Sequence, residues 1–474
     1  MLGRLSKSLN SNFSIIQIIL KPVFVESIDL DAQGVARLVN EDGSPGKVIF
    51  IDGALPGEWV TYRSYRSKKS YEQANLVEVH KPSALRAQPA CSFFGRCGGC
   101  SMQHLDPRAQ LAIKQRVLED NLWHLAKAKP EVLLRPIAGP TWQYRYRARM
   151  SIRHLDKKGV LIGFHEKKKS FIADMTSCQI LPKKVSDLLP ALRELIAQLS
   201  ISDRIPQLEM AVGESDSGEL LIILVLRHLE AFSDLDLIHL KGFQEKHGVR
   251  LWSQAKGPDT VKPLDGHYDK LCYRMPEFGI EMPFKPTDFT QVNHQINRVL
   301  VGKAVRLLNP QKNERVLDLF CGIGNFTLPI ATLAHEVYGI EGSELLTQRA
   351  KENAIANGLG DRVHFSCANL FEVTPEIVKS WGLASKWLID PPRDGAVALA
   401  QALASLHQSE NPSDRAYLPQ RIVYVSCNPA TLARDVGILV HTAGYQLKQA
   451  GVVNMFPHTS HIESIAIFER NERS

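Results

Sequence analysis

The sequence predicts a multidomain protein: a small N-terminal β-barrel, a central α+β domain and a C-terminal doubly wound α/β domain. Two observations lead to this prediction. Residues 1 to 82 alternate short apolar runs with turn-forming residues, whereas from residue 286 the pattern becomes strand, tight loop and helix, repeated. The length of 474 residues is sufficient for about three domains of ordinary size.

The barrel is predicted at residues 14–82, where Asp-Gly and Pro-Gly pairs mark turns between short apolar runs. The run 15–20 is interpreted as a first strand and not as a signal peptide, because a glutamine interrupts it and no small-residue cleavage site follows. Further strands are predicted at 48–51, 58–62 and 74–79.

The central domain is predicted at residues 83–285. It begins with a group of cysteines, and residues 107–127 then have the pattern of a helix. Strands are predicted at 147–153, 159–164 and 219–227.

The C-terminal domain is predicted at residues 286–474, as a largely parallel sheet whose strands alternate with helices. Ligands of such sheets bind at the carboxyl ends of the strands, so candidate functional residues are sought there. The strands are predicted at 315–320, 336–340, 362–365, 386–390, 421–425 and 465–468.

The composition is that of a globular protein, with 44% hydrophobic and 23% charged residues. This excludes a collagen, a coiled coil, a wholly disordered chain and a small disulfide-bonded domain. Eight cysteines, three of them within ten residues, are typical of a reduced compartment and a metal or cluster site. The cysteine usage and the absence of a signal peptide predict a cytoplasmic protein. Because no apolar run is long enough to span a bilayer, we expect no membrane partner, and no obligate protein partner is evident from the sequence.

The strand predicted at 315–320 runs into a glycine-containing loop that opens a helix. Gly322 and Gly324 allow the backbone to approach a ligand closely, but Thr327 replaces the third glycine of a dinucleotide-binding loop. Glu341 ends the next strand, where a carboxylate can accept from both ribose hydroxyls. Together these features favour S-adenosylmethionine, although a tight turn without a ligand would also explain the glycines.

Three reactive side chains are predicted at the carboxyl edge of the same sheet. Asp390 begins Asp-Pro-Pro-Arg393, which lacks the aromatic residue of amino-group methyltransferases; the alternative role for Asp390 is to cap the next helix. Cys427 lies where a strand ends and a helix begins, so that helix amides would stabilise a thiolate; the alternative is an inert buried thiol. Glu463 precedes the last predicted strand, where its carboxylate is positioned to act as a general base.

These residue types suit methylation of uracil at carbon 5. A thiolate adds to carbon 6, carbon 5 then attacks an electrophilic methyl group, and a base removes the carbon-5 proton so that the thiol leaves. In this scheme Cys427 is the nucleophile, Asp390 holds the uracil edge and Glu463 is the base. The neighbouring His458 and His461 could also act as bases, but we expect them to be exposed loop residues.

The cysteines at 91, 97 and 100 form a compact pattern, Cys-x5-Cys-Gly-Gly-Cys. Three thiolates require a fourth ligand, and Cys178 is the closest remaining cysteine in the sequence. Four thiolates could hold a [4Fe–4S] cluster or a structural zinc ion. A triplet with one remote cysteine favours the cluster, because zinc sites more often contain two Cys-x2-Cys pairs.

Basic residues are concentrated at 141–170. This segment contains nine Lys and Arg residues against two acidic ones, so it carries a charge equal to the chain's whole net charge of +7. Aromatic residues are interspersed, and Arg145, Arg147 and Arg149 would lie on one face of a strand. The alternative is an ordinary solvated surface, but a second basic and aromatic stretch at 61–71 favours RNA binding.

The chain resembles the bacterial RNA uracil-5 methyltransferases along nearly its whole length, most closely those that act on 23S ribosomal RNA. One departure is Asp390-Pro-Pro-Arg393, where close relatives have Asp-Pro-Ala-Arg. The segments that carry the resemblance are Gly34-Val-Ala-Arg37, the cysteines at 91–100, Phe289-Thr-Gln-Val-Asn293, 317–326, 426–434 and Met455-Phe-Pro-His-Thr459.

The resemblance implies a TRAM/OB-like RNA-binding barrel, a central iron–sulfur domain and a Rossmann-like class I methyltransferase domain, against which the helix near 108–128 packs. It implies Cys427 as nucleophile and Glu463 as base. It implies a [4Fe–4S] cluster on Cys91, Cys97, Cys100 and Cys178. It implies S-adenosylmethionine contacts at Gln291, Phe320, Asn325, Glu341, Asn369 and Asp390.

The expected function is therefore methyl transfer from S-adenosylmethionine to carbon 5 of a uridine in 23S ribosomal RNA. Two alternatives remain. One is the same chemistry on the T-loop uridine of tRNA, which the cysteine group disfavours because the tRNA enzymes of the family generally lack it. The other is a non-catalytic RNA-binding or assembly protein that carries an iron–sulfur cluster.

Overall fold

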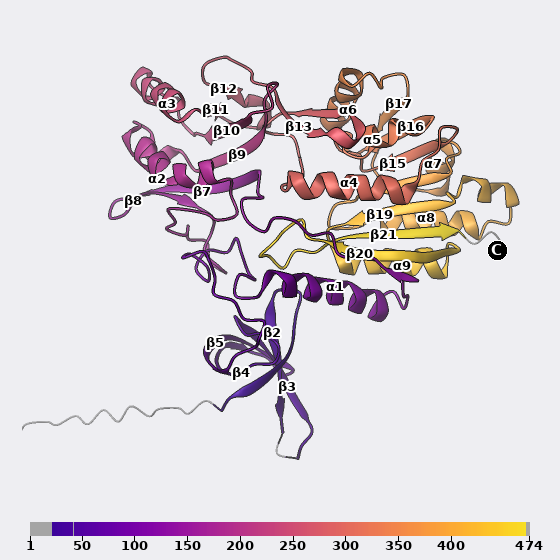
Figure 1. The fold of residues 1–474 in the computed structure, drawn as a ribbon, viewed down its shortest axis with the longest axis horizontal. Helices are drawn as coiled ribbons and strands as arrows, with labels where there is room; N and C mark the ends of the chain where they lie inside the picture. Colours follow the sequence, from indigo (N-terminus) through magenta and orange to yellow (C-terminus); the bar gives the residue numbers. More distant parts are fainter. Residues whose placement is uncertain (1–20, 41, 471–474) are drawn as a thin grey trace, which may run out of the picture. The chain divides into compact units, whose positions relative to one another are not determined.

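The computed structural model describes residues 21–40 and 42–470, so the strand predicted at 15–20 lies outside the described residues. Contacts between residues divide the chain into two units, 1–86 and 87–474 (Figure 1). The domain boundaries at 82 and 285 stay predictions. Within the described ranges, no helix has both the length and the apolar character needed to cross a membrane.

The first unit is a closed five-stranded barrel with the strand order β1-β2-β3-β5-β4. Its core consists of alternate inward-facing residues such as Val25, Ile49 and Ile51, which are completely buried. Gly34 is required where β1 meets β2, because a Cβ atom there would lie 2.8 Å from the Ala54 carbonyl oxygen. The strands are β1 (Val23–Ile28), β2 (Gln33–Val39), β3 (Pro45–Asp52), β4 (Trp59–Ser67) and β5 (Tyr71–Lys81).

The second unit contains two sheets, and the first of them is the central sheet. Its strands follow the order β12-β11-β10-β9-β13-β14, and β7 pairs with β8 and β9. One face packs against α2 (Lys183–Gln198) and α3 (Asp234–His247), since residues of both helices share a core with β7 to β10. The strands are β7 (Arg147–Leu155), β8 (Gly159–Gly163), β9 (Gln207–Glu214), β10 (Leu220–Arg227), β11 (Arg250–Gln254), β12 (Lys262–Pro263), β13 (Leu271–Met275) and β14 (Ile280–Phe284).

The second sheet, called the C-terminal sheet below, has the strand order β17-β16-β15-β18-β19-β21-β20-β6. Strands β15 to β19 are parallel, and β21 is antiparallel to both neighbours. The strands are β6 (Val132–Leu133), β15 (Arg315–Leu319), β16 (Glu336–Glu341), β17 (Val363–Cys367), β18 (Lys386–Ile389), β19 (Arg421–Ser426), β20 (Tyr445–Val453) and β21 (Glu463–Arg470).

Both faces of the C-terminal sheet are buried, as a continuously apolar parallel strand requires. Leu317 and Trp387 point into a core shared with α1, α8 and α9, whereas Val316 and Leu388 point into a core shared with α4 and α5. The helices are α1 (Pro107–His124), α4 (His294–Leu308), α5 (Thr327–Ala331), α6 (Glu344–Ala356), α7 (Pro375–Ser380), α8 (Val397–His407) and α9 (Pro429–His441).

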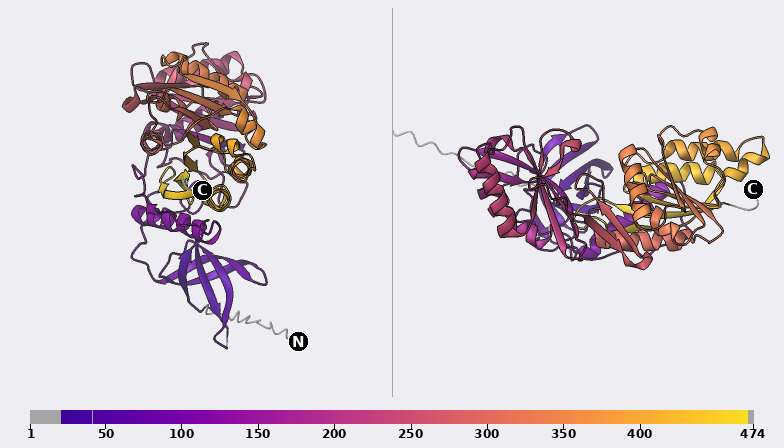
Figure 2. Two further views of the ribbon diagram at one scale, coloured as in Figure 1. Left: turned by 90° about the vertical axis from the view of Figure 1, so that its right-hand side faces the viewer. Right: turned by 90° about the horizontal axis from the view of Figure 1, so that it is seen from above.

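The segment that follows the first cysteines belongs physically to the C-terminal sheet. Leu118 and Leu122 of α1 lie in the same core as α9, and β6 adds a strand beside β20. The chain then crosses to the central sheet and returns through α4. Seen from above, the two sheets with their helices form adjacent lobes (Figure 2, right), and one core extends from the central sheet to α4.

Candidate active site and cysteine cavity

Cys427 and Glu463 are neighbours across two antiparallel strands. Ser426 ends β19 and is paired with Ser464 of β21, and the Ser464 hydroxyl donates to the Ser426 carbonyl oxygen at 3.2 Å. Cys427 is the next residue on one strand, and Glu463 is the preceding residue on the other. Directly opposite residues in such a pair have Cβ atoms about 5 Å apart, so the register itself brings this thiol and carboxyl group together.

Asp390 follows β18, the strand beside β19, and its backbone N–H donates to the Leu319 carbonyl oxygen at 3.2 Å. It does not cap the next helix, because Ala396 is the N-cap of α8. Three residues further on, the Arg393 carbonyl oxygen accepts from Asn428 Nδ2 at 3.2 Å and from Thr431 Oγ1 at 3.0 Å. Residues around the start of α9 therefore hold the loop that begins with Asp390.

Asp390, Cys427 and Glu463 lie at neighbouring strand ends of the C-terminal sheet, and we call these three residues the reactive edge. Burial raises the pKa of the Cys427 thiol to about 11; the carboxyl groups of Glu463 and Asp390 raise it further, and the Arg393 guanidinium opposes them. A backbone N–H also lowers the Cys427 pKa, in the direction that the sequence-based expectation of helix amides requires, but it does not set the net shift. Burial and the two carboxyl groups outweigh the helix N-terminus.

The two carboxyl groups of the reactive edge favour their protonated forms. Burial raises the pKa of Asp390 to about 7, and burial together with Asp390 raises the pKa of Glu463 well above its ordinary value. Glu463 is only 3% exposed. Since two buried carboxylates close together resist ionising at once, the pair retains a proton near neutral pH. A carboxylate with a raised pKa is also a stronger base once it is ionised.

The predicted S-adenosylmethionine contacts are distributed over the carboxyl ends of four adjacent strands. Phe320 follows β15, Glu341 ends β16, Asn369 follows β17 and Asp390 follows β18. Both Glu341 carboxylate oxygens accept from backbone N–H groups, those of Gly322 and Ser343, each at 3.0 Å. The strand order therefore brings these residues to one edge of the sheet.

Two other predicted contacts lie away from the strand ends. Gln291 lies between β14 and α4. Asn325 lies in the loop before α5, where its amide exchanges hydrogen bonds with Asn297 at 2.8 and 3.0 Å and accepts from Tyr273 Oη at 2.9 Å. Sequence reasoning missed Asn297 and Tyr273, because nothing in their local pattern points to a partner in a distant loop.

The aromatic residue Phe371 was also missed. It is 50% exposed and packs edge-on against Phe320, with 5.8 Å between ring centroids. Phe320 itself has a φ of 63°, which is unusual for a residue with a side chain and turns the loop away from the strand. An exposed aromatic residue two positions after a predicted ligand, Asn369, is the sequence signal that could have identified it.

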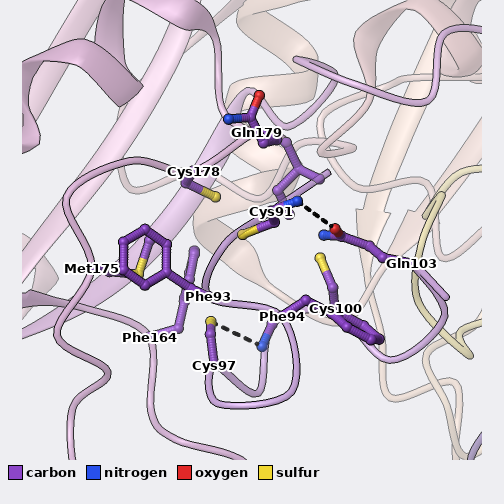
Figure 3. Close-up of a pocket in the computed structure, with 12 residues that line it drawn as sticks. Cys91, Phe93, Phe94, Cys97, Cys100, Gln103, Phe164, Met175, Cys178 and Gln179 are labelled. Carbon is purple, nitrogen blue, oxygen red and sulfur yellow. Dashed lines mark hydrogen bonds between the residues drawn. The ribbon is translucent and has the colours of Figure 1, made fainter. Parts of the chain in front are cut away.

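The four predicted metal-binding cysteines line one cavity, called the cysteine cavity below (Figure 3). Burial raises the pKa of Cys100 to about 12 and that of Cys178 to about 11. The loop is held by hydrogen bonds from Cys91 N to Gln103 Oε1 at 3.1 Å and from Gly99 N to Cys97 Sγ at 3.4 Å. The other lining side chains shown in Figure 3 are largely apolar: Phe93, Phe94, Phe164, Met175 and the amides Gln103 and Gln179.

The donor set of the cysteine cavity is four thiols. Four thiolates bound to a single zinc ion at about 2.3 Å would lie within about 4 Å of one another. In the described residues, no group of three or more His, Cys, Asp or Glu side chains is arranged to hold one ion. The four thiols nevertheless surround a common space.

The two histidines near Glu463 differ from the sequence-based expectation. His461 is exposed as expected, and its Nδ1 lies 3.2 Å from Arg393 Nη2. His458 is instead 2% exposed and stacks on Trp142, with 3.8 Å between ring centroids. Burial lowers the pKa of His458 to about 4, so it is neutral. The prediction of an exposed His458 was wrong because it packs against a segment more than 300 residues away in the sequence.

The arginines predicted to track phosphates are only partly available. Arg145 precedes β7 and is not part of the strand. Arg147 is half-buried and donates to the Thr287 carbonyl oxygen at 3.2 Å, while Arg149 pairs with Glu209 at 2.9 Å. Exposed basic residues of this region include Arg153, Lys157 and Lys158, at and near the β7–β8 turn.

Comparison with known proteins identifies the family. A family model described as tRNA (uracil-5-)-methyltransferase matches residues 106–471. The chain belongs to the tRNA (uracil-5-)-methyltransferase family. It is 63% identical over 447 residues to a Cupriavidus necator protein named 23S rRNA (uracil(1939)-C(5))-methyltransferase RlmD, covering 94% of this chain and 99% of that protein. A Burkholderia pseudomallei protein of the same name is 62% identical over 448 residues, covering 94% of each chain.

A solved structure of the (uracil-5-)-methyltransferase type has the same fold. The Pyrococcus abyssi tRNA (uracil-54, C5)-methyltransferase, in complex with S-adenosyl-L-homocysteine, superposes with a TM-score of 0.68. The match covers 94% of this chain and all of the other, at 22% identity. At that identity the likeness establishes the fold of this family member and not its substrate.

Proposed function

We propose that this protein transfers a methyl group from S-adenosylmethionine to carbon 5 of a uridine in 23S ribosomal RNA. The observation that carries the proposal is the register of β19 against β21, which sets the Cys427 thiol beside the Glu463 carboxyl group, with Asp390 at the end of the next strand. The relatives named for this reaction share more than 60% of their residues with nearly the whole chain.

In the proposed reaction, the Cys427 thiol releases its proton to solvent, Sγ bonds to carbon 6 of the uracil, and the electron pair of the C5–C6 double bond moves to carbon 5, while Glu463 is ionised. Asp390 holds the edge of the base. Carbon 5 bonds to the methyl group of S-adenosylmethionine, the bond from the sulfonium sulfur to that methyl group breaks, and S-adenosylhomocysteine leaves. Glu463 then removes the carbon-5 proton, the electron pair of that C–H bond forms the C5–C6 double bond, and the bond from carbon 6 to Sγ breaks.

We propose that S-adenosylmethionine is held along the strand ends by Phe320, Glu341, Asn369 and Asp390, together with Gln291 and Asn325. Glu341 supports this assignment, because each of its oxygens accepts one backbone N–H and keeps a lone pair for a ribose hydroxyl. The Asn325 amide is already bonded to Asn297 and Tyr273, so its proposed part is to fix the loop after β15.

We propose that Cys91, Cys97, Cys100 and Cys178 hold a [4Fe–4S] cluster. The support is chemical: four thiols line one largely apolar cavity, burial raises the pKa of Cys97, Cys100 and Cys178, and binding iron would deprotonate all four thiols. The cluster's proposed contribution is to hold the loop after Cys91 against the central sheet. RNA contacts are proposed separately for the exposed part of the basic region in the second unit and for the barrel in the first.

The substrate is tested with the purified protein, tritiated S-adenosylmethionine and two RNAs, unmethylated 23S ribosomal RNA and unmodified tRNA. The proposal expects label in the 23S RNA, released as 5-methyluridine on nuclease digestion, at a rate at least about a hundredfold above the rate on tRNA. The reverse preference would make the tRNA uridine the substrate. Binding of 23S RNA without label transfer would favour the non-catalytic alternative.

A further inference from the structure

The loop between β20 and β21, residues 454–462, ends at the proposed base Glu463 and is held by an unusual set of contacts. Four consecutive carbonyl oxygens in it each accept a hydrogen bond from a different part of the second unit. The donors are Asn293 Nδ2 to Met455 O at 3.4 Å, Lys114 Nζ to Phe456 O at 2.9 Å, Tyr144 Oη to Pro457 O at 2.9 Å, and the N–H groups of Ser101 and Met102 to His458 O at 2.9 and 3.0 Å.

Gln110 of α1 joins this loop to the segment that follows Cys100. Its Oε1 accepts from the His458 N–H at 2.9 Å, and its Nε2 donates to the Met102 and Leu105 carbonyl oxygens, both at 2.9 Å. The same Nε2 lies 3.2 Å from His458 Nδ1. Gln110 is completely buried, so water cannot replace these bonds.

Lys114, one helical turn further along α1, contacts the beginning of the loop. Its Nζ donates to Asn454 Oδ1 at 3.1 Å as well as to the Phe456 carbonyl oxygen, and the residue is 1% exposed. His458 has a φ of 64°, a left-handed conformation that a residue with a side chain keeps only when its surroundings impose it. Gln110 and Lys114 are well placed to impose it.

Cys427 and Asp390 lie outside the loop that Gln110 and Lys114 bind, although Leu118 and Leu122 of the same helix pack in one core with α9. Cys427 is fixed by β19 and α9, and the loop after Asp390 is fixed by Asn428 and Thr431. Glu463 is the residue of the reactive edge that directly follows the α1-supported loop. Loss of the α1 contacts should therefore disturb proton removal more than thiol addition or methyl transfer.

We propose that Gln110 and Lys114 are positioning residues for the base, which hold residues 454–462 so that the Glu463 carboxylate reaches the carbon-5 proton. This inference rests on the proposed function. The step it governs is the last one: the proton moves to the carboxylate, the C–H electron pair forms the C5–C6 double bond, and the Cys427 thiolate leaves carbon 6.

The test compares two rates in the full-length protein for Gln110→Ala and Lys114→Met. One is turnover on 23S RNA; the other is formation of a denaturation-resistant adduct on the same RNA containing 5-fluorouridine, which has no carbon-5 proton and therefore reports only the earlier steps. We expect turnover to fall about tenfold or more, the adduct rate to change by less than about threefold, and a methylated covalent complex to accumulate on ordinary RNA.

The matched control is Gln115→Ala. Gln115 lies on the same helix, and its Oε1 accepts from Val452 N at 3.2 Å in β20, outside the loop. We expect both of its rates to stay within about twofold of the wild type. Gln110→Asn, which keeps the amide but shortens its reach, replaces Gln110→Ala if the alanine variant does not fold.

Equal falls in both rates, or unchanged turnover, would overturn the inference, because either would mean that α1 has no specific effect on the base. Failure of the proposed function is distinguishable, since the wild-type protein would then form no adduct with 5-fluorouridine RNA. That result would overturn the function and the inference together.

Discussion

The cysteine cavity and the reactive edge both bury thiols and raise their pKa, but their surroundings differ. The described residues that line the cavity include no Lys or Arg, and the thiols there have one another as their nearest ionisable neighbours. At the reactive edge, Cys427 has two carboxyl groups and the Arg393 guanidinium beside it. The cavity thiols therefore need an added cationic centre to ionise together, whereas Cys427 already has a cationic neighbour, Arg393, which opposes the effect of the two carboxyl groups on its pKa.

The largest expected effect comes from removing the thiol of the reactive edge. Cys427→Ala should lower methylation of 23S RNA by at least about 10⁴-fold and abolish the adduct with 5-fluorouridine RNA, since no other group there can add to carbon 6. Both effects are measured by label transfer and by gel shift under denaturing conditions.

The control for this substitution is Cys272→Ala. Cys272 is a completely buried thiol in β13 whose Sγ contacts the Glu214 carbonyl oxygen at 3.3 Å. Activity should remain near the wild-type level in this variant. If the Cys427→Ala protein still methylated RNA, Cys427 would not be the nucleophile. The difference between the two thiol environments would then have no bearing on catalysis.

The second-largest expected effect distinguishes the role of Glu463 as base from the role of Cys427 as nucleophile. Glu463→Gln keeps the size of the side chain but cannot accept a proton, so turnover should fall about 10²- to 10⁴-fold while thiol addition and methyl transfer continue. A methylated protein–RNA complex should accumulate on ordinary RNA and be visible by mass spectrometry. Turnover at the wild-type rate would place the base elsewhere, with the exposed His461 as the next candidate to substitute.

The next-largest expected effect concerns the iron and sulfide bound in the cysteine cavity. Anaerobically purified protein should contain about four iron and four sulfide per chain, and Cys100→Ala should lose most of both. Because a cluster bound to the four thiols would tie the loop that leads into α1 to the central sheet, its loss should also lower the melting temperature by several degrees. Cys272→Ala should keep its iron. One zinc ion per chain and no sulfide would instead assign the cavity to a mononuclear site.

Six of the eight strands of the C-terminal sheet were predicted from the sequence to within about two residues, because a strand buried on both faces is a continuous apolar run; β6 and β20 were not predicted. β15 and β19 are examples: the predicted 315–320 and 421–425 are observed as Arg315–Leu319 and Arg421–Ser426. The residues at their carboxyl ends could be found for the same reason. The fold therefore indicated where to look for Asp390 and Cys427.

The residues that support the site could not be found in this way. Gln110 and Lys114 contact residues about 340 positions away in the sequence, and no local pattern indicates such a partner. The sequence does contain one indication. Gln110 and Lys114 lie eight and four residues before Leu118, respectively, so these two polar side chains are on the same helix face as the buried Leu118 and Leu122. Polar residues in that position require buried partners, but the sequence does not say which.

The smallest expected effect is on the free energy of unfolding. It shows whether a buried acid near the reactive edge lowers this free energy at neutral pH. Asp318 of β15 is completely buried, and burial raises its pKa to about 8, with Asp390 and Glu341 adding to the rise. An acid whose pKa is raised by folding binds its proton more tightly in the folded state. Its contribution to the free energy of unfolding is therefore present at low pH and declines as the pH rises from about 4 to about 8.

Asp318→Asn removes this titration while leaving an oxygen that can still accept from the Thr327 hydroxyl. Relative to the wild type, the variant should become more stable as the pH rises from 5 to 8, by at most about 1.4 kcal/mol per pH unit, measured by urea unfolding at each pH. Asp435→Asn is the contrast, because Asp435 is equally buried but pairs with Arg434 at 2.8 Å. That variant should be destabilised across the range, since an acid that already has a cationic partner gains nothing from losing its charge.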